Sequence, residues 1–332
     1  MRAPYFWSAG LDPRSREAAP LTRALLTPLA ALYVFGLRRK LAGAKPETAP
    51  VPVICIGNLT TGGAGKTPVT EAVRARLVAA GLRAASLSRG HGGSSRGPLR
   101  VDPAVHGFRD TGDEPLLLAA SGEAWIGRDR PEAARAMAAD GVQVIVMDDG
   151  HQNPSLVKDL SLVVIDAGAP FGNGHLLPKG PLREPVADGL ARADAVVLVG
   201  EGPVPGAVAR SGKPVLRAAL VPAMPPPSGP LVAFAGIGRP EKFFDSLTAA
   251  GAVLADAIPY PDHHPYSAGE IAYLQRHAGD LDAQLVTTSK DHVRLPPEAR
   301  ERVVAWPVTL SFGDMAALDA VLAPIFNKLQ AR

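Results

Sequence analysis

The chain of 332 residues has a single cysteine, Cys55, and few aromatic residues, which make up 5% of the total. One thiol excludes an internal disulfide framework, and its position in an apolar run favours a small core side chain. Apolar residues reach 46% and charged residues 20%, which is typical of globular proteins. The length and composition predict one large domain or two ordinary domains with an ample core.

A strong charge of one sign is also missing, since the net charge is only +3. Residues 1–47 carry eight basic and three acidic side chains, so the basic excess is confined to the N-terminal segment. A nucleic-acid-binding surface would need a basic stripe on the folded domain. We therefore expect no nucleic-acid partner, and nothing in the sequence indicates an obligatory protein partner.

The sequence has no long uncharged run of the length that crosses a bilayer. Its most apolar segment, ALLTPLAALYVFGL at 24–37, has 14 uncharged residues, whereas a span needs about 20. Three basic residues follow this run, which is the reverse of a secretory signal. Two interpretations remain: a helix in a membrane interface with its cations toward anionic headgroups, or a helix packed on the protein's own core.

The rest of the chain alternates short apolar runs with helical patterns, which predicts an α/β fold. The runs at 51–57, 84–88, 142–149, 160–167 and 195–200 are apolar throughout, as in a parallel sheet covered by helices on both faces. We predict a P-loop NTPase-like sheet, a smaller C-terminal α/β domain that includes a strand at 302–310, and an N-terminal amphipathic helix. The expected divisions are an N-terminal interfacial region at 1–45, a P-loop domain at 46–220, a proline-rich hinge at 221–230 and a C-terminal domain at 231–332.

The segment GNLTTGGAGKTP at 57–68 stands between a predicted strand and a predicted helix. It matches the P-loop pattern G-x-x-x-x-G-K-[ST] except at the first glycine, where the chain has Thr60. In such a loop the backbone N–H groups surround a phosphate, the lysine reaches the β- and γ-phosphates, and the hydroxyl binds Mg²⁺. The predicted nucleotide-binding residues are Thr60, Thr61, Gly62, Gly63, Ala64, Gly65, Lys66 and Thr67.

A second motif, VIVMDDGHQN at 144–153, is an apolar run that ends in two acids. Beside a P-loop, such a strand end supplies the carboxylate that positions Mg²⁺. Asp148 and Asp149 are adjacent, so on a strand they point to opposite sides, one toward Mg²⁺ and one toward the phosphoryl acceptor. Asp-Asp-Gly is also good turn chemistry, but its pairing with a P-loop favours the metal role.

Four further segments are rich in polar groups without a decisive signal of their own. TGDEP at 111–115 fits a helix N-cap, IGRDR at 126–130 could clamp a phosphate, and the histidines of YPDHHPYS at 260–267 fit a solvent-facing loop. PFGNGHLLPKGPLREP at 170–185 is a long glycine- and proline-rich loop that contains Asn173 and Arg183.

Taken together and in this order, these segments resemble the tetraacyldisaccharide 4'-kinase family. The matching stretches are GNLTTGGAGKTP, SRGHGG, TGDEP, GRDR, DDGHQN, FGNGHLLPKGPLRE, PDHH and TTSKDHVRL. The resemblance implies transfer of the γ-phosphate of ATP to the 4'-hydroxyl of a tetraacyldisaccharide 1-phosphate, giving lipid IVA, at the cytoplasmic face of the inner membrane. It also implies two domains joined by a hinge, and a family that tolerates a small residue in place of the first loop glycine.

The resemblance further implies roles for single residues. Asp113 corresponds to the catalytic carboxylate near the sugar hydroxyl, and His263 to its partner from the second domain. Asp148 and Asp149 correspond to the pair near Mg²⁺ and the phosphates, and Arg130 to a phosphate-contacting arginine. With Lys66 these form the expected catalytic set, and Thr67, Asp148 and Asp149 form the expected Mg²⁺ site. Substrate contacts are expected from Asn173, Arg183 and Gln152.

The chain departs from the family pattern at His91, His151, Asn153 and Ser289, where Tyr, an aromatic residue, His and Glu are usual. Asn153 removes an imidazole, and His151 could replace it if 151–153 is extended. A P-loop switch or metallochaperone-type NTPase is the alternative function, although it does not account for the PDHH and FGNG loops. A substrate with four acyl chains stays in the bilayer, which favours the interfacial interpretation of 24–37.

Overall fold

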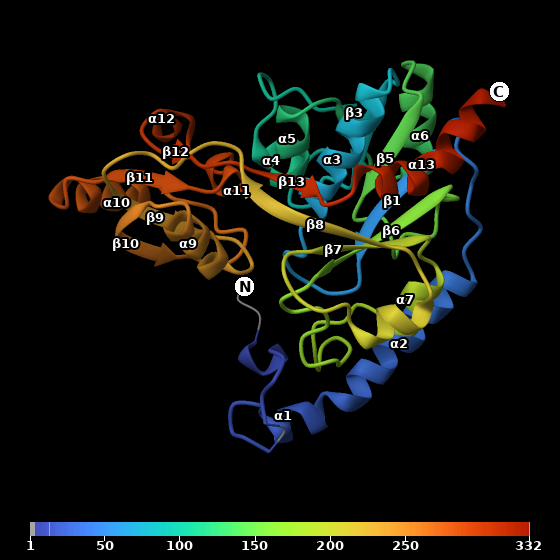
Figure 1. The fold of residues 1–332 in the computed structure, drawn as a ribbon, viewed down its shortest axis with the longest axis horizontal. Helices are drawn as coiled ribbons and strands as arrows, with labels where there is room; N and C mark the ends of the chain where they lie inside the picture. The colour runs from blue at the N-terminus through green and yellow to red at the C-terminus, as the bar shows by residue number, and fades with distance from the viewer. Residues whose placement is uncertain (1–3, 13, 332) are drawn as a thin grey trace.

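The computed structural model describes residues 4–12 and 14–331; the parts of the predicted terminal regions at 1–3, 13 and 332 lie outside it. Two sheets organise the chain, a large one on the right of Figure 1 and a small one on the left. The large sheet has the order β13-β8-β7-β6-β1-β5-β2-β4-β3. Its strands are β1 (Val53–Asn58), β2 (Ala84–Ser88), β3 (Leu99–Arg100), β4 (Ala124–Ile126), β5 (Val144–Asp148), β6 (Leu160–Asp166), β7 (Ala195–Val199), β8 (Val215–Pro222) and β13 (Val308–Phe312).

The predicted parallel sheet with helices on both faces is confirmed. Strands β2, β5, β1, β6, β7 and β8 run parallel, and only the two edge strands are antiparallel to their neighbours. One face packs against α3 (Lys66–Ala79) and α13 (Met315–Gln330). The other face packs against α6 (Arg130–Ala139), α7 (Val186–Ala191) and α8 (Gly206–Ser211). Burial on both faces is why the central strands are apolar throughout.

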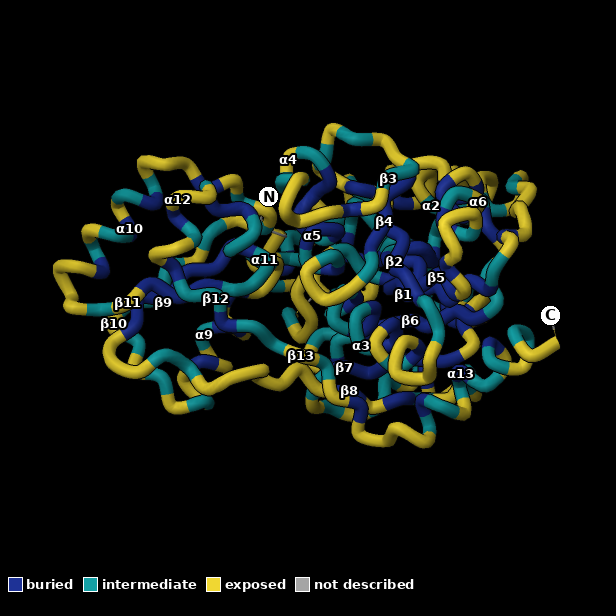
Figure 2. Tube along the Cα trace, turned by 90° about the horizontal axis from the view of Figure 1, so that it is seen from above, coloured by how far each residue is buried: buried dark blue, intermediate teal, exposed yellow. Residues whose placement is uncertain are grey.

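The small sheet is parallel, with the order β10-β9-β11-β12. Its strands are β9 (Pro230–Ala235), β10 (Val253–Pro259), β11 (Gln284–Thr287) and β12 (Val304–Ala305). It has its own buried core, seen in Figure 2 as a second dark region separate from that of the large sheet. The helices of this unit are α9 (Pro240–Ala249), α10 (Ala268–Asp280), α11 (Ser289–His292) and α12 (Pro297–Arg300).

The last part of the chain departs from the predicted domain division. The strand expected at 302–310 is two strands: β12 lies in the small sheet, and β13 pairs with β8 in the large one. Helix α13 then buries Leu318, Leu322 and Ile325 in the core of the large unit. The reason is local, because Pro307 lacks an N–H and ends the first strand before the chain crosses back.

Two chain segments therefore connect the units, where the sequence had indicated one. The proline-rich segment at 223–229 has neither helix nor strand, and the second crossing follows Trp306. The two segments lie side by side: the Ala223 N–H donates to the Pro307 carbonyl at 3.0 Å, and Trp306 Nε1 donates to the Met224 carbonyl at 3.0 Å. A paired connection restricts twisting of one unit against the other more than a single linker does.

The N-terminal segment forms a short 3₁₀ turn, η1 (Tyr5–Trp7), and then the helices α1 (Pro20–Leu25) and α2 (Thr27–Ala42) along the lower surface of the large unit in Figure 1. By length and composition Pro20–Ala42 is long and apolar enough to cross a membrane, although its uncharged run alone is not. Within α2 only Ala30 is buried. The helix is apolar around most of its circumference and less amphipathic than predicted.

Candidate active site

The P-loop lies at the carboxyl end of β1 and leads directly into α3, as its sequence context predicts. Gly62 and Gly65 have φ values of 108° and 85°, a left-handed conformation that glycine adopts without a steric cost. Lys66 is the first residue of α3 and is buried, with its Nζ 3.6 Å from Asp149 Oδ1. Thr67 follows in the first helical turn, where the N-terminus of the helix favours an anion.

Thr60 takes the place of the first glycine because this position is extended. It pairs with Leu182 in an isolated antiparallel bridge, and its neighbour Thr61 donates its N–H to the Pro181 carbonyl at 2.8 Å. Thr60 is not among the residues with positive φ, so a side chain at this position causes no strain. The loop at 170–185 therefore supports the P-loop from outside.

The two adjacent carboxylates lie in different surroundings, but not through the predicted strand alternation, because only Asp148 belongs to β5. Asp148 ends β5, is fully buried, and accepts a hydrogen bond from Thr70 Oγ1 at 3.0 Å. Burial, with a contribution from Glu114, raises the pKa of Asp148 well above its usual range. Asp149 has φ of 50°. Its Oδ1 pairs with Lys66 Nζ at 3.6 Å and with Arg183 Nη1 at 2.7 Å.

Burial would raise the pKa of Asp149, but the Lys66 and Arg183 cations more than offset it and hold that pKa below its usual range. Asp149 therefore stays ionised beside the P-loop lysine. Its left-handed backbone is uncommon for a residue other than glycine and is stored strain of a kind that concentrates at functional sites.

Arg130 begins α6 and is buried, and its guanidinium donates to the Gly127 carbonyl through Nη1. Burial lowers its pKa to about 10, and the nearby Asp148 carboxylate opposes that change. Its Nε has no hydrogen-bond partner among the described residues. The structure thus brings Arg130 close to the acidic pair, with an unused donor.

Asp113 lies where the small unit meets the large one. It is the first residue of α5 (Asp113–Ala120), which follows α4 (Phe108–Thr111) and Gly112. Gly112 has φ of 89°, and a Cβ there would meet the His91 carbonyl at 2.3 Å. The close packing of the SRGHGG loop on this glycine fixes the start of α5, and so the direction of Asp113.

His263 reaches Asp113 from the small unit, across 150 residues of sequence. Its Nδ1 lies 2.9 Å from Asp113 Oδ2. The loop after β10 places it there with a left-handed φ of 57°, and its N–H donates to the Gly236 carbonyl at 3.1 Å. His263 and Asp113, which the sequence places far apart, are therefore in direct contact.

Two cations from TTSKDHVRL complete this contact, and sequence reasoning assigned neither a role. Arg294 Nε donates to Asp113 Oδ2 at 2.9 Å, and Lys290 Nζ lies 3.2 Å from His263 Nε2. Burial opposes ionisation of Asp113, but the His263 hydrogen bond and the Lys290 and Arg294 cations hold its pKa well below the usual range. The sequence signal that could have pointed to them is a pair of basic residues, Lys290 and Arg294, four positions apart after a predicted strand.

The three residues expected to contact substrate divide into two groups. Gln152 Nε2 donates to the Asn58 carbonyl and to Glu184 Oε1, both at 2.8 Å, and Arg183 pairs with Asp149, so these two belong to the site. Asn173 does not: its amide donates to the Phe6 carbonyl at 2.8 Å and its N–H to the Trp7 carbonyl. The FGNG turn therefore holds the N-terminal segment in place.

His151 does not replace the missing imidazole of Asn153. The segment is a turn, because Asn153 N–H donates to the Gly150 carbonyl at 2.9 Å, so the two side chains do not alternate as on a strand. His151 is buried and bonds through Nε2 to the Gly189 carbonyl on α7, and burial lowers its pKa to about 4. Asn153 Oδ1 accepts from the N–H and hydroxyl of Ser155.

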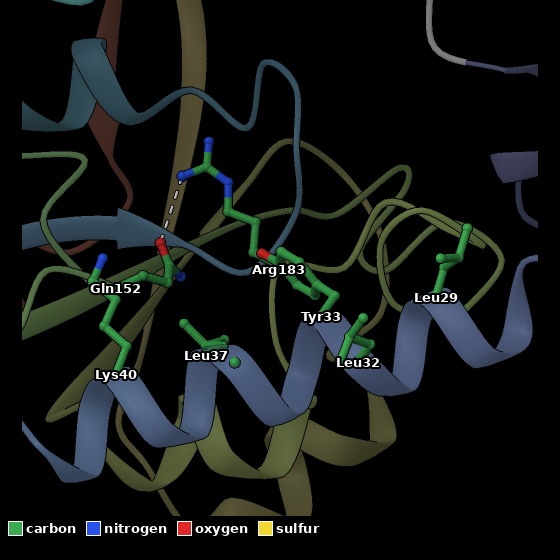
Figure 3. A pocket seen from close by; sticks show the side chains of 8 residues that line it. Leu29, Leu32, Tyr33, Leu37, Lys40, Gln152 and Arg183 are labelled. Carbon is green, nitrogen blue, oxygen red and sulfur yellow. Dashed lines mark hydrogen bonds between the residues drawn. The ribbon is translucent and has the colours of Figure 1, made fainter.

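A groove of about 670 Å³ separates α2 from the site. Figure 3 shows Tyr33 and Leu37 of α2 beside Arg183 and Gln152, with Leu29 farther along the same helix. Arg183, at the inner end of the groove, binds Asp149, and Asp149 in turn pairs with the P-loop lysine, Lys66. An apolar surface thus leads directly to the anion-binding groups.

Comparisons with known proteins agree with this geometry. The family model described as tetraacyldisaccharide-1-P 4'-kinase matches residues 22–327. The chain is 72% identical to a tetraacyldisaccharide 4'-kinase of Hyphomonas neptunium, over 99% of each chain, and 54% identical to one of Rhodospirillum centenum, over 98% of this chain and 97% of that one.

Among solved structures, LpxK from Aquifex aeolicus in complex with ATP matches with a TM-score of 0.72 and 26% identity, over 92% of this chain and 99% of that one. These matches extend over nearly the whole sequence and include both units and the N-terminal helix. The chain therefore belongs to the tetraacyldisaccharide 4'-kinase family.

Proposed function

We propose that this protein transfers the γ-phosphate of ATP to the 4'-hydroxyl of a tetraacyldisaccharide 1-phosphate, as the family name states. The observation that carries the proposal is the contact of Asp113 with His263 and Arg294 across the two units, beside a P-loop. A nucleotide switch needs only the P-loop and the acidic strand end. A kinase also needs groups that receive an acceptor hydroxyl, and this interdomain contact supplies them.

The nucleotide phosphates are assigned to the backbone of 60–65, with Lys66 on the β- and γ-phosphates. The second unit closes directly over this loop, since a Cβ at Gly238 would meet the Gly63 backbone nitrogen at 3.3 Å. Asp166 at the end of β6 joins the same closure by accepting from Arg239 Nη1 and Lys242 Nζ, both at 2.7 Å. Closure excludes water that would otherwise hydrolyse ATP.

The residues present fit a Mg²⁺ ion bound together with nucleotide. The described part of the chain has no group of three or more acidic, histidine or cysteine side chains that would hold a metal without help. Mg²⁺ beside phosphates usually takes one or two protein carboxylates. Asp148 Oδ2 is buried without a hydrogen-bond partner among the described residues, so we assign the ion to Asp148, Asp149 and Thr67. When bound, it would neutralise charge on the phosphates.

His263 is the group best placed to receive the hydroxyl proton. Asp113 is buried, and both of its oxygens are bonded: Oδ2 to His263 and Arg294, and Oδ1 to the Glu114 N–H at 3.0 Å. The His263 side chain is 44% exposed, and its Nε2 is the ring nitrogen that does not contact Asp113. Asp113 therefore orients the ring through Nδ1, and Nε2 accepts the proton of the sugar hydroxyl, as in other carboxylate–histidine pairs.

The acyl chains of the acceptor are assigned to the groove beside α2, whose inner end is Arg183 and Gln152. The helix lies on the large unit, because Arg23 at one end bonds to His175 at 2.6 Å and Arg38 at the other bonds to Asp188 at 2.8 Å. Both ends of one helical segment contact the same unit, which supports a helix lying in the membrane interface at the cytoplasmic face of the inner membrane.

A transfer assay with γ-labelled ATP and the tetraacyldisaccharide tests the function. We expect label in the lipid, little ATP hydrolysis until the lipid is added, and a large loss of turnover in Asp113→Asn and in His263→Ala. Because the two residues act as a unit, the double variant should be little worse than either single one. Rapid hydrolysis that the lipid does not change would instead support the NTPase switch.

A further inference from the structure

Lys290 stands at the outer end of a chain of polar contacts that crosses the interface between the units. Its Nζ lies 3.2 Å from His263 Nε2, and the other ring nitrogen of His263 lies 2.9 Å from Asp113 Oδ2. Asp113 in turn accepts from Arg294. The order along this chain is cation, imidazole, carboxylate and cation, and three of its four members come from the small unit.

The chemistry of these groups fixes the proton on His263. An ammonium group only donates hydrogen bonds, so Nε2 must be the unprotonated, accepting nitrogen. The proton therefore resides on Nδ1 and is donated to Asp113. A doubly protonated ring could not accept from Lys290, so this arrangement selects the neutral imidazole in one of its two tautomers, the form that a proton acceptor needs.

We propose that Lys290 is a positioning residue that acts through His263: it holds the ring as the Nδ1–H tautomer with Nε2 free of a proton, until the sugar hydroxyl replaces the lysine on Nε2. The inference rests on the role proposed above for His263. Lys290 has other partners to turn to, since Glu114 Oε1 lies 3.8 Å and Asp262 Oδ1 3.7 Å from its Nζ.

Atoms and charge are conserved in the transfer step. The sugar oxygen forms a bond to the γ-phosphorus, the bond from that phosphorus to the bridging oxygen of ATP breaks, and ADP leaves. The hydroxyl proton passes to Nε2, and the resulting imidazolium is held by the Asp113 carboxylate. When the units open, the proton is lost to solvent and Lys290 returns to Nε2.

The pH dependence of activity separates this role from a merely structural one. The charged groups around His263 and Lys290 come from α5, from the loop of His263, and from α11 and the segment after it: Asp113, Glu114, Asp262, Lys290 and Arg294. The Lys290 ammonium lies 3.2 Å from the ring, and a cation at that distance repels a second proton on it. Since the neutral ring is the active form, Lys290→Met should move the acidic limb of the kcat/KM profile to higher pH.

The experiment compares the full-length protein with Lys290→Met, Lys290→Arg, His263→Ala and the Lys290→Met/His263→Ala double variant in the lipid transfer assay. We expect Lys290→Met to lower kcat about tenfold, part of the ~10²–10⁴ that positioned proton transfer contributes, with the KM for ATP little changed. Lys290→Arg should keep the acidic limb near its wild-type position. In the His263→Ala background, Lys290→Met should cost nothing further.

Lys242→Met is the matched control, because it removes another cation of the small unit that contacts the large one, through Asp166, without touching His263. Its acidic limb should not move. Histidine ¹⁵N spectra give a readout apart from activity: the His263 signals, identified by their loss in His263→Ala, should show Nδ1–H in the wild type and a shift toward Nε2–H in Lys290→Met. If Lys290→Met folds poorly, Lys290→Gln serves in its place.

Multiplicative losses in the double variant, or an unmoved acidic limb together with an unchanged tautomer, would overturn the role of Lys290 and leave the kinase function intact. Full activity of His263→Ala would instead overturn the role proposed for His263. The two failures are therefore distinguishable within one set of variants.

Discussion

The membrane contact proposed for α1 predicts a loss of lipid binding whose size can be worked out from side-chain exposure. The apolar stripe of the N-terminal helices consists of Leu21, Leu25, Leu29, Leu32 and Phe35, which repeat at helical spacing and are all exposed. Leu21 and Leu25 are 81% and 77% exposed and do not line the groove. The double substitution Leu21→Gln/Leu25→Gln therefore tests bilayer contact without changing the proposed acyl-chain site.

The magnitude follows from the apolar surface that these two residues would bury. A fully buried leucine side chain is worth about 1.5–3 kcal/mol, and about four fifths of each side chain is free to insert. The two substitutions should therefore weaken partitioning by about 2.4–4.8 kcal/mol, which is roughly 50- to 3000-fold in the binding constant.

Cosedimentation with liposomes that contain anionic lipid, at fixed ionic strength, measures this loss directly. The matched control is Val253→Gln, which removes an exposed apolar side chain from β10 in the small unit and should leave partitioning near its wild-type value. ATP binding by each variant serves as the folding check. A loss of less than about threefold in the double variant would refute the assignment of this stripe to the bilayer, because it would fall far below the transfer free energy of two leucines.

Three further predictions concern the site. Arg294→Met leaves the buried Asp113 carboxylate without the buried guanidinium that donates to it, so urea denaturation should show a loss of about 3 kcal/mol or more in unfolding free energy; a loss below 1 kcal/mol would contradict this. The folded-state pKa of Asp113 is depressed, so its ionised form stabilises the fold above about pH 4, and this contribution is lost as the pH falls. Between pH 5 and 3 the unfolding free energy of the wild type should therefore fall by about 1 kcal/mol more than that of Asp113→Asn. Equal losses in the two proteins would argue against the depressed pKa. Asn153→Ala removes two hydrogen bonds to Ser155 and should lower the unfolding free energy by about 1 kcal/mol, while kcat stays near the wild-type value. A large fall in kcat at unchanged stability would instead show that Asn153 acts in the reaction.

The local parts of the fold and site followed from the sequence because each is encoded in one short segment. A P-loop needs a strand, a glycine-rich turn and a helix in succession, and 53–79 contains all three. The buried parallel strands were recognisable because they are apolar on both faces. The alternation predicted for Asp148 and Asp149 does not account for their difference, because Asp149 follows the strand in a left-handed conformation. Their pKa directions depend on the burial of Asp148 and on Lys66 and Arg183 beside Asp149.

Other features depended on contacts between distant segments, which no local pattern records. Arg294 lies 181 residues from Asp113 in the sequence, and nothing near either residue indicates the other. Pro307 shows where a strand ends, but only the free edge of β8 decides that β13 pairs there and that α13 covers the large sheet. The turn at 149–153 buried His151 against α7, where an extended segment would have kept it beside Asn153.

The sequence by itself determined that this chain has a P-loop beside a pair of carboxylates and carries an apolar helix at its N-terminus. Short-range geometry suffices for these conclusions, because hydrogen bonds and dihedral angles within about ten residues specify them. The tertiary structure alone decided which groups of the two units come into contact. A carboxylate of the large unit and an imidazole, a lysine and an arginine of the small unit come together only because two crossings hold one unit over the other, and their charges acquire their effect at that distance.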